Sequence, residues 1–189
     1  KLHILDALGI GLAASRYDYS HKTLTAMHGL AGEGPYPVIG MPAGLPLRDA
    51  AQMNGFLIHA LDFDDTHVAG VIHATCTAVS TLLAMGQKHA ISGREMLIAY
   101  LAAVESDARL GMAAKGGFHR KGFHPTGMVG AYGAAIAAGR AAGLTRAQLC
   151  DAQGIVLGMA SGTLGFLDEG AWNKRLHAGW ASVAGITAA

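Results

Sequence analysis

The chain has 189 residues, of which 51% are hydrophobic and 14% are charged, with a formal net charge of +1 at pH 7. This composition excludes a disordered chain, and the length suits one ordinary domain with a sizeable core or a large piece of a bigger protein. The near-neutral charge and the 6% of aromatic residues argue against a nucleic-acid binder, which usually has a basic excess interleaved with aromatic residues.

The sequence also bears on whether the chain spans a membrane and on how its cysteines are used. Charged residues and glycines interrupt every apolar run before it reaches about 18 residues, so we expect no membrane span and no membrane partner. The two cysteines, Cys76 and Cys150, are far apart and fit neither a disulfide framework nor a thiolate metal site, which suits a reducing cytoplasm. The chain begins at Lys1 without a signal pattern and stops at Ala189 within an apolar stretch, so we expect a domain that is incomplete at both ends.

Apolar residues spaced three and four apart recur along the chain, as is typical of helices, while strand-like alternation hardly occurs. In chain order the stripes are Leu5, Leu8 and Leu12; Met53, Leu57 and Leu61; Cys76, Val79 and Leu83; and Leu97, Leu101, Val104 and Ala108. Residues 32–46 hold four prolines and predict a long loop between the first two stripes. The pattern favours an all-α fold.

Helix boundaries agree with this interpretation. Ser92-Gly-Arg-Glu95 and Thr145-Arg-Ala-Gln148 have the form of a capping box, and Gly143 is suited to end the helix before it. The 27 glycines, many beside alanine, allow helix axes to approach closely. We therefore expect residues 1–189 to form one tightly packed helical domain.

The densest group of polar side chains runs from Asn54 to His67 and is followed by His73. Three carboxylates fall within four residues at Asp62-Phe-Asp64-Asp65. Helical spacing would put Asn54 and Asp62 on one face and thus in one cavity. A solvated acidic turn at a helix end explains the same residues without any function.

A metal site is a weaker interpretation of this segment. A calcium loop starting at Asp62 would need glycine at position six and glutamate at position twelve, where the chain has His67 and His73. No H-E-x-x-H motif occurs either. A metal-dependent hydrolase stays open only if its ligands come from distant helices, and we expect no metal.

Two further clusters could bind an anion. Residues 115–126 include Lys121 and His124 in a short basic stretch with several glycines, which is typical either of an anion site or of a solvated loop. Lys174 lies near the start of a Gly- and Ala-rich helix, where the helix dipole would add to its charge and favour a carboxylate. Alone, Lys174 would be read as a surface charge.

These clusters, in this order, resemble the MmgE/PrpD family, which includes 2-methylcitrate dehydratase, cis-aconitate decarboxylase and iminodisuccinate epimerase. The resemblance covers nearly the whole chain. Its elements are Leu5-Asp6-Ala-Leu-Gly9, Asn54-Gly55, Ala60-Leu-Asp62-Phe-Asp64-Asp65-Thr66-His67, His73, Ser92-Gly-Arg-Glu95, Gly122-Phe-His124-Pro-Thr126, and Lys174 with Gly179. One departure is Ala74 after His73, where the family usually has proline.

The resemblance implies an all-helical domain whose α+β lid is absent from this chain, with the active site between the two. It implies His73 as the principal proton-transfer group, Asp62 as the residue that orients its partners, and Lys174 as a stabiliser of negative charge. Substrate contacts are expected from Thr66, His124, Lys121 and Asn54.

The function expected from the resemblance is a cytoplasmic lyase that uses no cofactor and dehydrates 2-methylcitrate, or a similar hydroxy-tricarboxylate, in propionate metabolism. Decarboxylation of cis-aconitate and epimerisation of an imino diacid begin with related proton chemistry and stay open. An alternative of another class is a noncatalytic domain that binds polycarboxylates. A homodimer formed through the helical domain is implied by the family alone.

Overall fold

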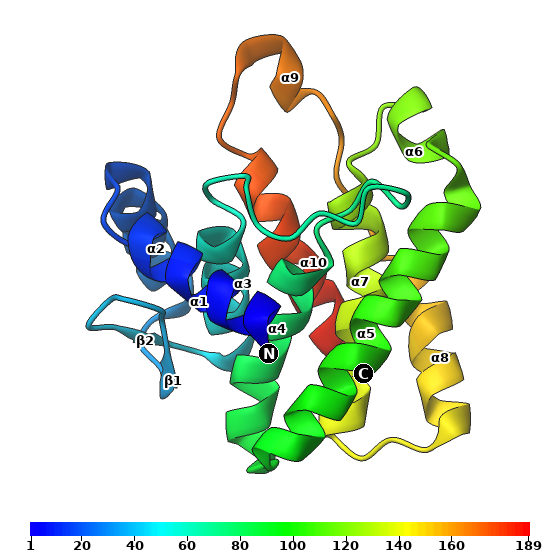
Figure 1. Cartoon of the computed structure of the whole chain (residues 1–189). Coiled ribbons are helices and arrows are strands. Elements are labelled where there is room, and N and C mark those ends of the chain that lie inside the picture. The colour runs from blue at the N-terminus through cyan, green and yellow to red at the C-terminus, as the bar shows by residue number, and fades with distance from the viewer.

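The structure is a computed structural model that describes all 189 residues. It consists of ten helices and a two-stranded sheet. In chain order they are α1 (Leu2–Ala14), α2 (Asp18–Ala31), β1 (Tyr36–Pro37), β2 (Gly44–Leu45), α3 (Leu47–Ile58), α4 (Ala74–His89), α5 (Gly93–Ala114), α6 (Gly117–Arg120), α7 (Pro125–Ala141), α8 (Arg146–Leu157), α9 (Phe166–Glu169) and α10 (Lys174–Ala188) (Figure 1). The all-α class is confirmed, and none of the helices combines the length and apolar character that crossing a bilayer requires.

The predicted loop at residues 32–46 contains the small sheet. Tyr36 pairs with Leu45 and Pro37 with Gly44 in an antiparallel register. The hairpin lies beside α3 at one side of the molecule (Figure 1). Proline tolerates such an edge position because it need not donate a ladder hydrogen bond there.

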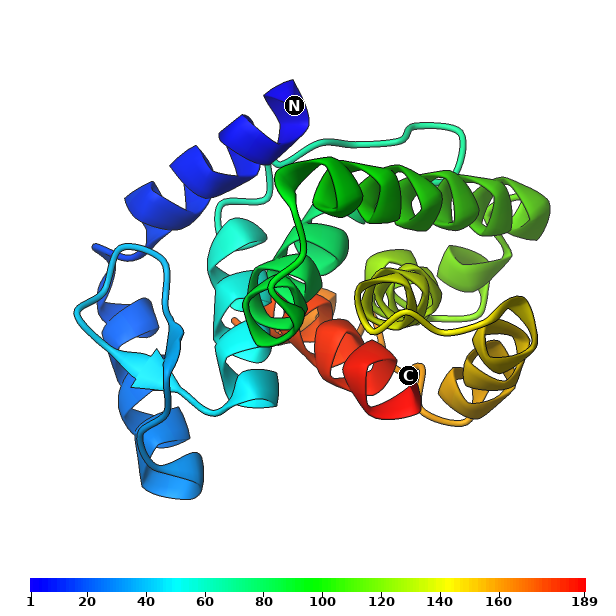
Figure 2. The same ribbon diagram turned by 90° about the horizontal axis from the view of Figure 1, so that it is seen from below.

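Helix α7 is the centre of the bundle. Helices α4, α5, α8 and α10 all pack against it, as the view along its axis shows (Figure 2). Most of its residues are glycine or alanine and most are buried. A helix that is apolar on all sides is stable only inside such a ring of neighbours.

Glycines bring α3 and α10 into direct contact, as the composition predicts. A Cβ atom built on Gly55 would lie 2.8 Å from the Cα atom of Gly179, and one on Gly179 would collide with the carbonyl oxygen of Gln52. Only glycine fits at these two positions. This contact seats the start of α10 against the end of α3.

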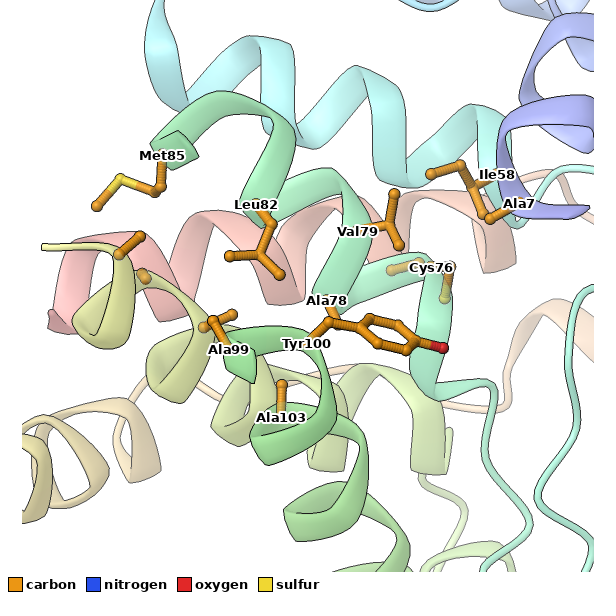
Figure 3. Close-up of a cluster of buried hydrophobic side chains, with 14 residues drawn as sticks. Ala7, Ile58, Cys76, Ala78, Val79, Leu82, Met85, Ala99, Tyr100 and Ala103 are labelled. Carbon is orange, nitrogen blue, oxygen red and sulfur yellow. The ribbon is translucent and has the colours of Figure 1, made fainter. Parts of the chain in front are cut away.

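The largest core cluster lies between α3, α4 and α5. Its side chains include Cys76, Val79 and Leu82 of α4, with Ile58 and Tyr100 on either side (Figure 3). Tyr100 is nearly buried, and its hydroxyl is 2.7 Å from that of Thr75, so the phenol keeps a polar partner inside the core.

Two of the predicted apolar stripes differ in part from the faces that the helices bury, although Val104 and Ala108 of the α5 stripe do face the core. In α1 the leucines at positions 5 and 12 are 68% and 53% exposed, and the buried face is formed by Ala7, Ile10, Gly11 and Ala14. In α5, Leu101 is 64% exposed while Ala99 and Ala103 are buried. Close packing selects the small side chains for the contacts and leaves the larger leucines outside.

The predicted helix boundaries are confirmed. Both capping boxes form, with Ser92 accepting from the backbone amide of Glu95 and Thr145 from that of Gln148. Helix α7 ends at Ala141, and Gly143 follows with φ of +75°. Glycine adopts this left-handed conformation without the strain that a side chain would add.

Three connections gather at one end of the bundle: residues 59–73, the stretch around α6, and the segment that contains α9 (Figure 1). Backbone hydrogen bonds tie the last two together, because His124 donates to Gly162 and Leu164 donates to Gly122. This end carries all the polar clusters identified in the sequence.

Candidate active site

Three helices begin at this end and each contributes a candidate side chain. His73 is the N-cap residue of α4, His124 is the N-cap residue of α7, and Lys174 is the first residue of α10. The backbone amide of His73 donates to the hydroxyl of Thr126 over 3.1 Å, which fixes α4 against α7. Helix N-termini carry partial positive charge and free amides, so their convergence favours an anion.

Asp62 joins two of these helix starts. Its carboxylate accepts a hydrogen bond from the Lys174 ammonium, and the same oxygen lies 3.8 Å from Nε2 of His73. Helix α3 has already ended at Ile58, and Asp62 adopts φ of +59° in the following turn. The expectation that Asn54 and Asp62 share a helical face is therefore wrong.

Asn54 has a structural role at a distance from these groups. Its buried amide accepts from the backbone of Ile39 over 2.9 Å and donates to the carbonyl of Pro37 over 3.0 Å. These bonds fasten the hairpin segment to α3. The apolar hollow of about 280 Å³ beside Asn54 has no charged side chain in its wall, so we do not place chemistry there.

A buried histidine–aspartate pair lies behind His73, and the sequence did not predict this contact. His59 and Asp64 are 1% and 2% exposed, and Nδ1 of His59 lies 3.1 Å from both carboxylate oxygens of Asp64. Nδ1 of His73 is 3.4 Å from one of these oxygens and 3.2 Å from the Asp64 carbonyl. These two oxygens accept hydrogen bonds, so in the neutral His73 ring we place the proton on Nδ1, which leaves the lone pair of Nε2 free.

Opposing effects set the charge of Asp64. Burial raises its pKa, but the hydrogen bond and charge of His59 and the charge of His73 outweigh burial, and the pKa is held below its ordinary value. Asp64 is therefore an anion at neutral pH. As an anion it accepts from both imidazoles and orients them.

His124 is uncharged in the fold. Burial is the largest cause, and electrostatic interactions with the neighbouring His59, His177 and Lys174 add to it, so the pKa of His124 is lowered to about 2. The expectation of a protonated histidine that attracts carboxylates does not suit this environment. His124 acts instead as a neutral imidazole whose Nδ1 lies 3.0 Å from Nδ1 of His177, a residue to which the sequence assigned no site role.

Two adjoining pockets surround Lys174, and Phe166 and Leu167 also line both. The histidine pocket, of about 150 Å³, is formed by Thr66, Val71, His73, His119, His124, Pro125, Thr126, Leu164 and the three shared residues. The lysine pocket, of about 270 Å³, is formed by His59, Ala60, Asp62, Gly170, Ala171, Arg175 and the same three. Together the two pockets have room for a small organic acid, and their walls carry polar and cationic side chains.

The predicted substrate-binding residues fall into two groups. Thr66 and His124 line the histidine pocket, and the Thr66 hydroxyl lies 3.5 Å from Nδ1 of His73. Lys121 is exposed after α6 and lines neither pocket, whereas His119 from the same stretch does line one. The basic stretch therefore contributes different side chains from those expected.

The cluster offers donors that a divalent ion could use. His59, Asp62 and His73 each present one donor atom within 4.8 Å of the others, as do His59, Asp64 and Cys76. However, the Lys174 ammonium already neutralises Asp62, and burial raises the pKa of the Cys76 thiol so that it keeps its proton. These features suit an organic anion better than a metal.

Comparison with known proteins covers the whole chain. Residues 1–189 match the family model of the MmgE/PrpD N-terminal domain. The chain is 32% identical to cis-aconitate decarboxylase of Homo sapiens over 196 residues, covering 100% of this chain and 40% of that protein. It is 31% identical to the Mus musculus protein of that name (100% and 39% covered) and 29% identical to that of Aspergillus terreus (98% and 39% covered). The chain thus spans about two fifths of the length of these relatives.

Proposed function

The chain belongs to the MmgE/PrpD family, and we propose that it is the helical part of a lyase that acts on a small polycarboxylate by acid–base proton transfer. The observation that carries this proposal is the convergence of His73, Asp62 and Lys174 at neighbouring helix starts, with His73 and Lys174 both in contact range of one Asp62 oxygen. Such a group can bind an acid and move a proton beside its carboxylate.

Binding would rest on Lys174 and on the dipoles of the three helix starts. The Lys174 side chain is 23% exposed, so its charge is partly shielded from water while it reaches both pockets. A fixed charge in such a site stabilises negative charge that develops during a reaction more strongly than it would in water. Asp62 holds the ammonium in place until a substrate carboxylate arrives.

Proton transfer would rest on His73. Imidazole ordinarily titrates near neutral pH, and general acid–base groups of this kind contribute about 10²–10⁴-fold to a rate. Asp64 holds Nδ1 of His73, so Nε2, with its free lone pair, is the atom that would take a proton from the substrate, and a proton given to the substrate would come from another group. Thr66 would contribute a hydrogen bond to the substrate from the same pocket.

Two lyase reactions fit this arrangement. The names of the relatives at about 30% identity favour decarboxylation of an unsaturated tricarboxylate such as cis-aconitate. In that reaction the bond to the carboxyl carbon breaks, CO₂ leaves, and the remaining carbanion takes a proton. Dehydration of 2-methylcitrate or a similar hydroxy acid stays a prediction, and the epimerase and the noncatalytic binding domain stay alternatives.

The test uses the full-length protein and a panel of di- and tricarboxylic acids, followed by NMR in deuterated water. We expect loss of CO₂ and deuterium incorporation from one tricarboxylate. His73→Ala should lower kcat about 10²-fold or more at unchanged stability. Near-wild-type turnover by the folded His73→Ala protein would refute its assigned role, and tight binding without any exchange would favour the noncatalytic alternative.

Two lysines provide a matched pair of variants. Lys174→Ala should mainly weaken binding of the multiply charged acids, because it removes a cation from both pockets. Lys121→Ala removes the same charge from an exposed position outside them and should leave KM within about twofold. An unchanged KM in Lys174→Ala across the panel would show that Lys174 is only a surface residue.

A homodimer is part of the proposal and rests on an exposed apolar patch. Leu2 and Leu5 of α1 line one hollow with Phe63, and these three side chains are 80%, 68% and 66% exposed. Exposed patches of this kind often mark protein interfaces. Light scattering of the full-length protein tests the dimer, and a cytoplasmic location stays a prediction.

A further inference from the structure

Behind the histidine pocket lies a second hollow of about 420 Å³, here called the rear pocket. Its wall includes Gln52, Ser161, Thr163, Asn173, His177 and Trp180. His177 lines the rear pocket and not the histidine pocket, while His124 lines the histidine pocket and not the rear one. The two imidazoles therefore stand between the hollows.

The two rings are directly joined. Their Nδ1 atoms are 3.0 Å apart and their centroids 5.2 Å apart. A hydrogen bond between two imidazole nitrogens holds one proton, so one Nδ1 donates and the other accepts. The tautomer of one ring therefore fixes that of the other, and each ring has only Nε2 left to exchange a proton with its own hollow.

The surroundings keep both rings neutral. His124 is 4% exposed, and burial together with the nearby cations lowers its pKa to about 2. Burial and the charges of His59 and Lys174 also lower the pKa of His177. A proton given up or taken by one ring must therefore be replaced or passed on at once, because a buried imidazolium is disfavoured.

We propose that His177 is the residue through which His124 exchanges protons with solvent, so that the pair relays a proton between the rear pocket and a substrate in the histidine pocket. This inference rests on the proposed lyase function. Decarboxylation of a carboxylate consumes one proton, and that proton must reach a pocket that bound substrate fills.

The relay balances as follows. Nε2 of His124 gives its proton to the substrate carbon that holds the electron pair left by CO₂. Nδ1 of His124 takes the proton of Nδ1 of His177, and Nε2 of His177 takes a proton from water in the rear pocket. The hydroxide left by that water is neutralised by bulk solvent or takes up the released CO₂ as bicarbonate, so the net reaction consumes one proton. Both rings have changed tautomer and neither has become an imidazolium. After the product leaves, water entering the histidine pocket reprotonates Nε2 of His124 and the reverse shift restores the starting state.

His177 acts through His124, so it is a positioning residue. Its variants must distinguish passing a proton to His124 from merely holding His124 in place. His177→Ala should lower kcat at least tenfold with KM within about twofold, and added imidazole, which fits the enlarged rear pocket, should restore part of kcat. His177→Gln keeps a hydrogen bond to His124 but cannot pass a proton, so its kcat should stay low. His89→Ala removes an imidazole from the exposed last residue of α4, outside all three pockets, and should keep wild-type kcat.

Wild-type kcat in His177→Ala, full kcat in His177→Gln, or no rescue by imidazole would overturn the relay. A second measurement does not depend on activity: ¹⁵N NMR of histidine-labelled full-length protein should show one protonated and one bare Nδ1 in the pair. Two equivalent Nδ1 signals, both protonated or both bare, would also overturn it. A wild-type protein that turns over no acid in the panel refutes the lyase instead, whereas an active wild type with an active His177→Ala refutes only the relay.

Discussion

The buried carboxylate of Asp64 gives the sharpest test of how the site is held together. Asp64→Asn keeps the shape of the side chain and one acceptor oxygen, but it puts an NH₂ group where the second oxygen lay 3.1 Å from Nδ1 of His59. The change removes one charge-assisted hydrogen bond, worth about 1.5–3 kcal/mol. It also places the new NH₂ group against the Nδ1–H group of an imidazole, so that two donors face each other. We expect the free energy of unfolding to fall by about 2–4 kcal/mol at pH 7.

The loss should depend on pH in a definite direction. Because the fold lowers the pKa of Asp64, its stabilisation is present above the unfolded-state pKa of about 3.9 and is lost as the pH falls below it. Urea unfolding from pH 7 down to pH 3 should therefore show wild type and Asp64→Asn converging in the acid range. Activity should fall about 10²-fold or more, because Nδ1 of His73 loses its anionic partner.

Asp65 is the matched control one residue away. It accepts from the Thr75 amide over 3.2 Å, and burial raises its pKa, so its charge is not what stabilises the fold. Asp65→Asn keeps that acceptor and should cost less than about 1 kcal/mol. Equal losses in the two variants, or wild-type stability in Asp64→Asn, would refute the reasoning.

Three further predictions follow from packing and burial. Gly179→Ala should lower the free energy of unfolding by about 1–3 kcal/mol, because its methyl group meets backbone of α3; a calorimetric scan with an unchanged Tm would contradict this. Asp107 is fully buried, its Oδ2 has no hydrogen-bond partner, and burial raises its pKa. The folded protein therefore keeps this carboxyl neutral while the unfolded chain ionises it, and stability falls as the pH rises from about 4 towards the folded-state pKa. Asp107→Asn should therefore gain stability relative to wild type between pH 4 and pH 8 in urea titrations, and a constant difference would argue against a neutral Asp107. A thiol reagent should label the exposed Cys150 under native conditions and reach the buried Cys76 only on unfolding, as mass spectrometry of the labelled peptides would show.

The sequence predicted features whose signal is local. The capping boxes and the glycine after α7 depend on short patterns with one physical solution. The glycine content predicted close helix packing, but not that Gly55 and Gly179 would meet. The motif order also pointed to Asp62, His73 and Lys174, which the fold brings together.

The sequence did not predict two histidine contacts of the site, because the residues in contact are brought together only by the fold. His59 reaches Asp64 across the turn at Asp62, and His177 meets His124 from 53 residues away. His59 lies within the polar group that runs from Asn54 to His67, but no spacing in the sequence gave a role to either histidine. Leu5 faces outward because alanine and glycine allow α1 to sit closer to the bundle than a leucine contact would.

The three helix starts beneath the pockets suggest how a nearly neutral chain would hold the trianion that we propose as its substrate. With a net charge of +1, the protein generates almost no long-range field to attract such a ligand. Attraction would come instead from peptide dipoles and one ammonium at contact distance, well inside the Debye length of about 8 Å at physiological ionic strength. Affinity for the acid should accordingly change little with added salt, and capture should proceed at the ordinary rate of unsteered diffusion.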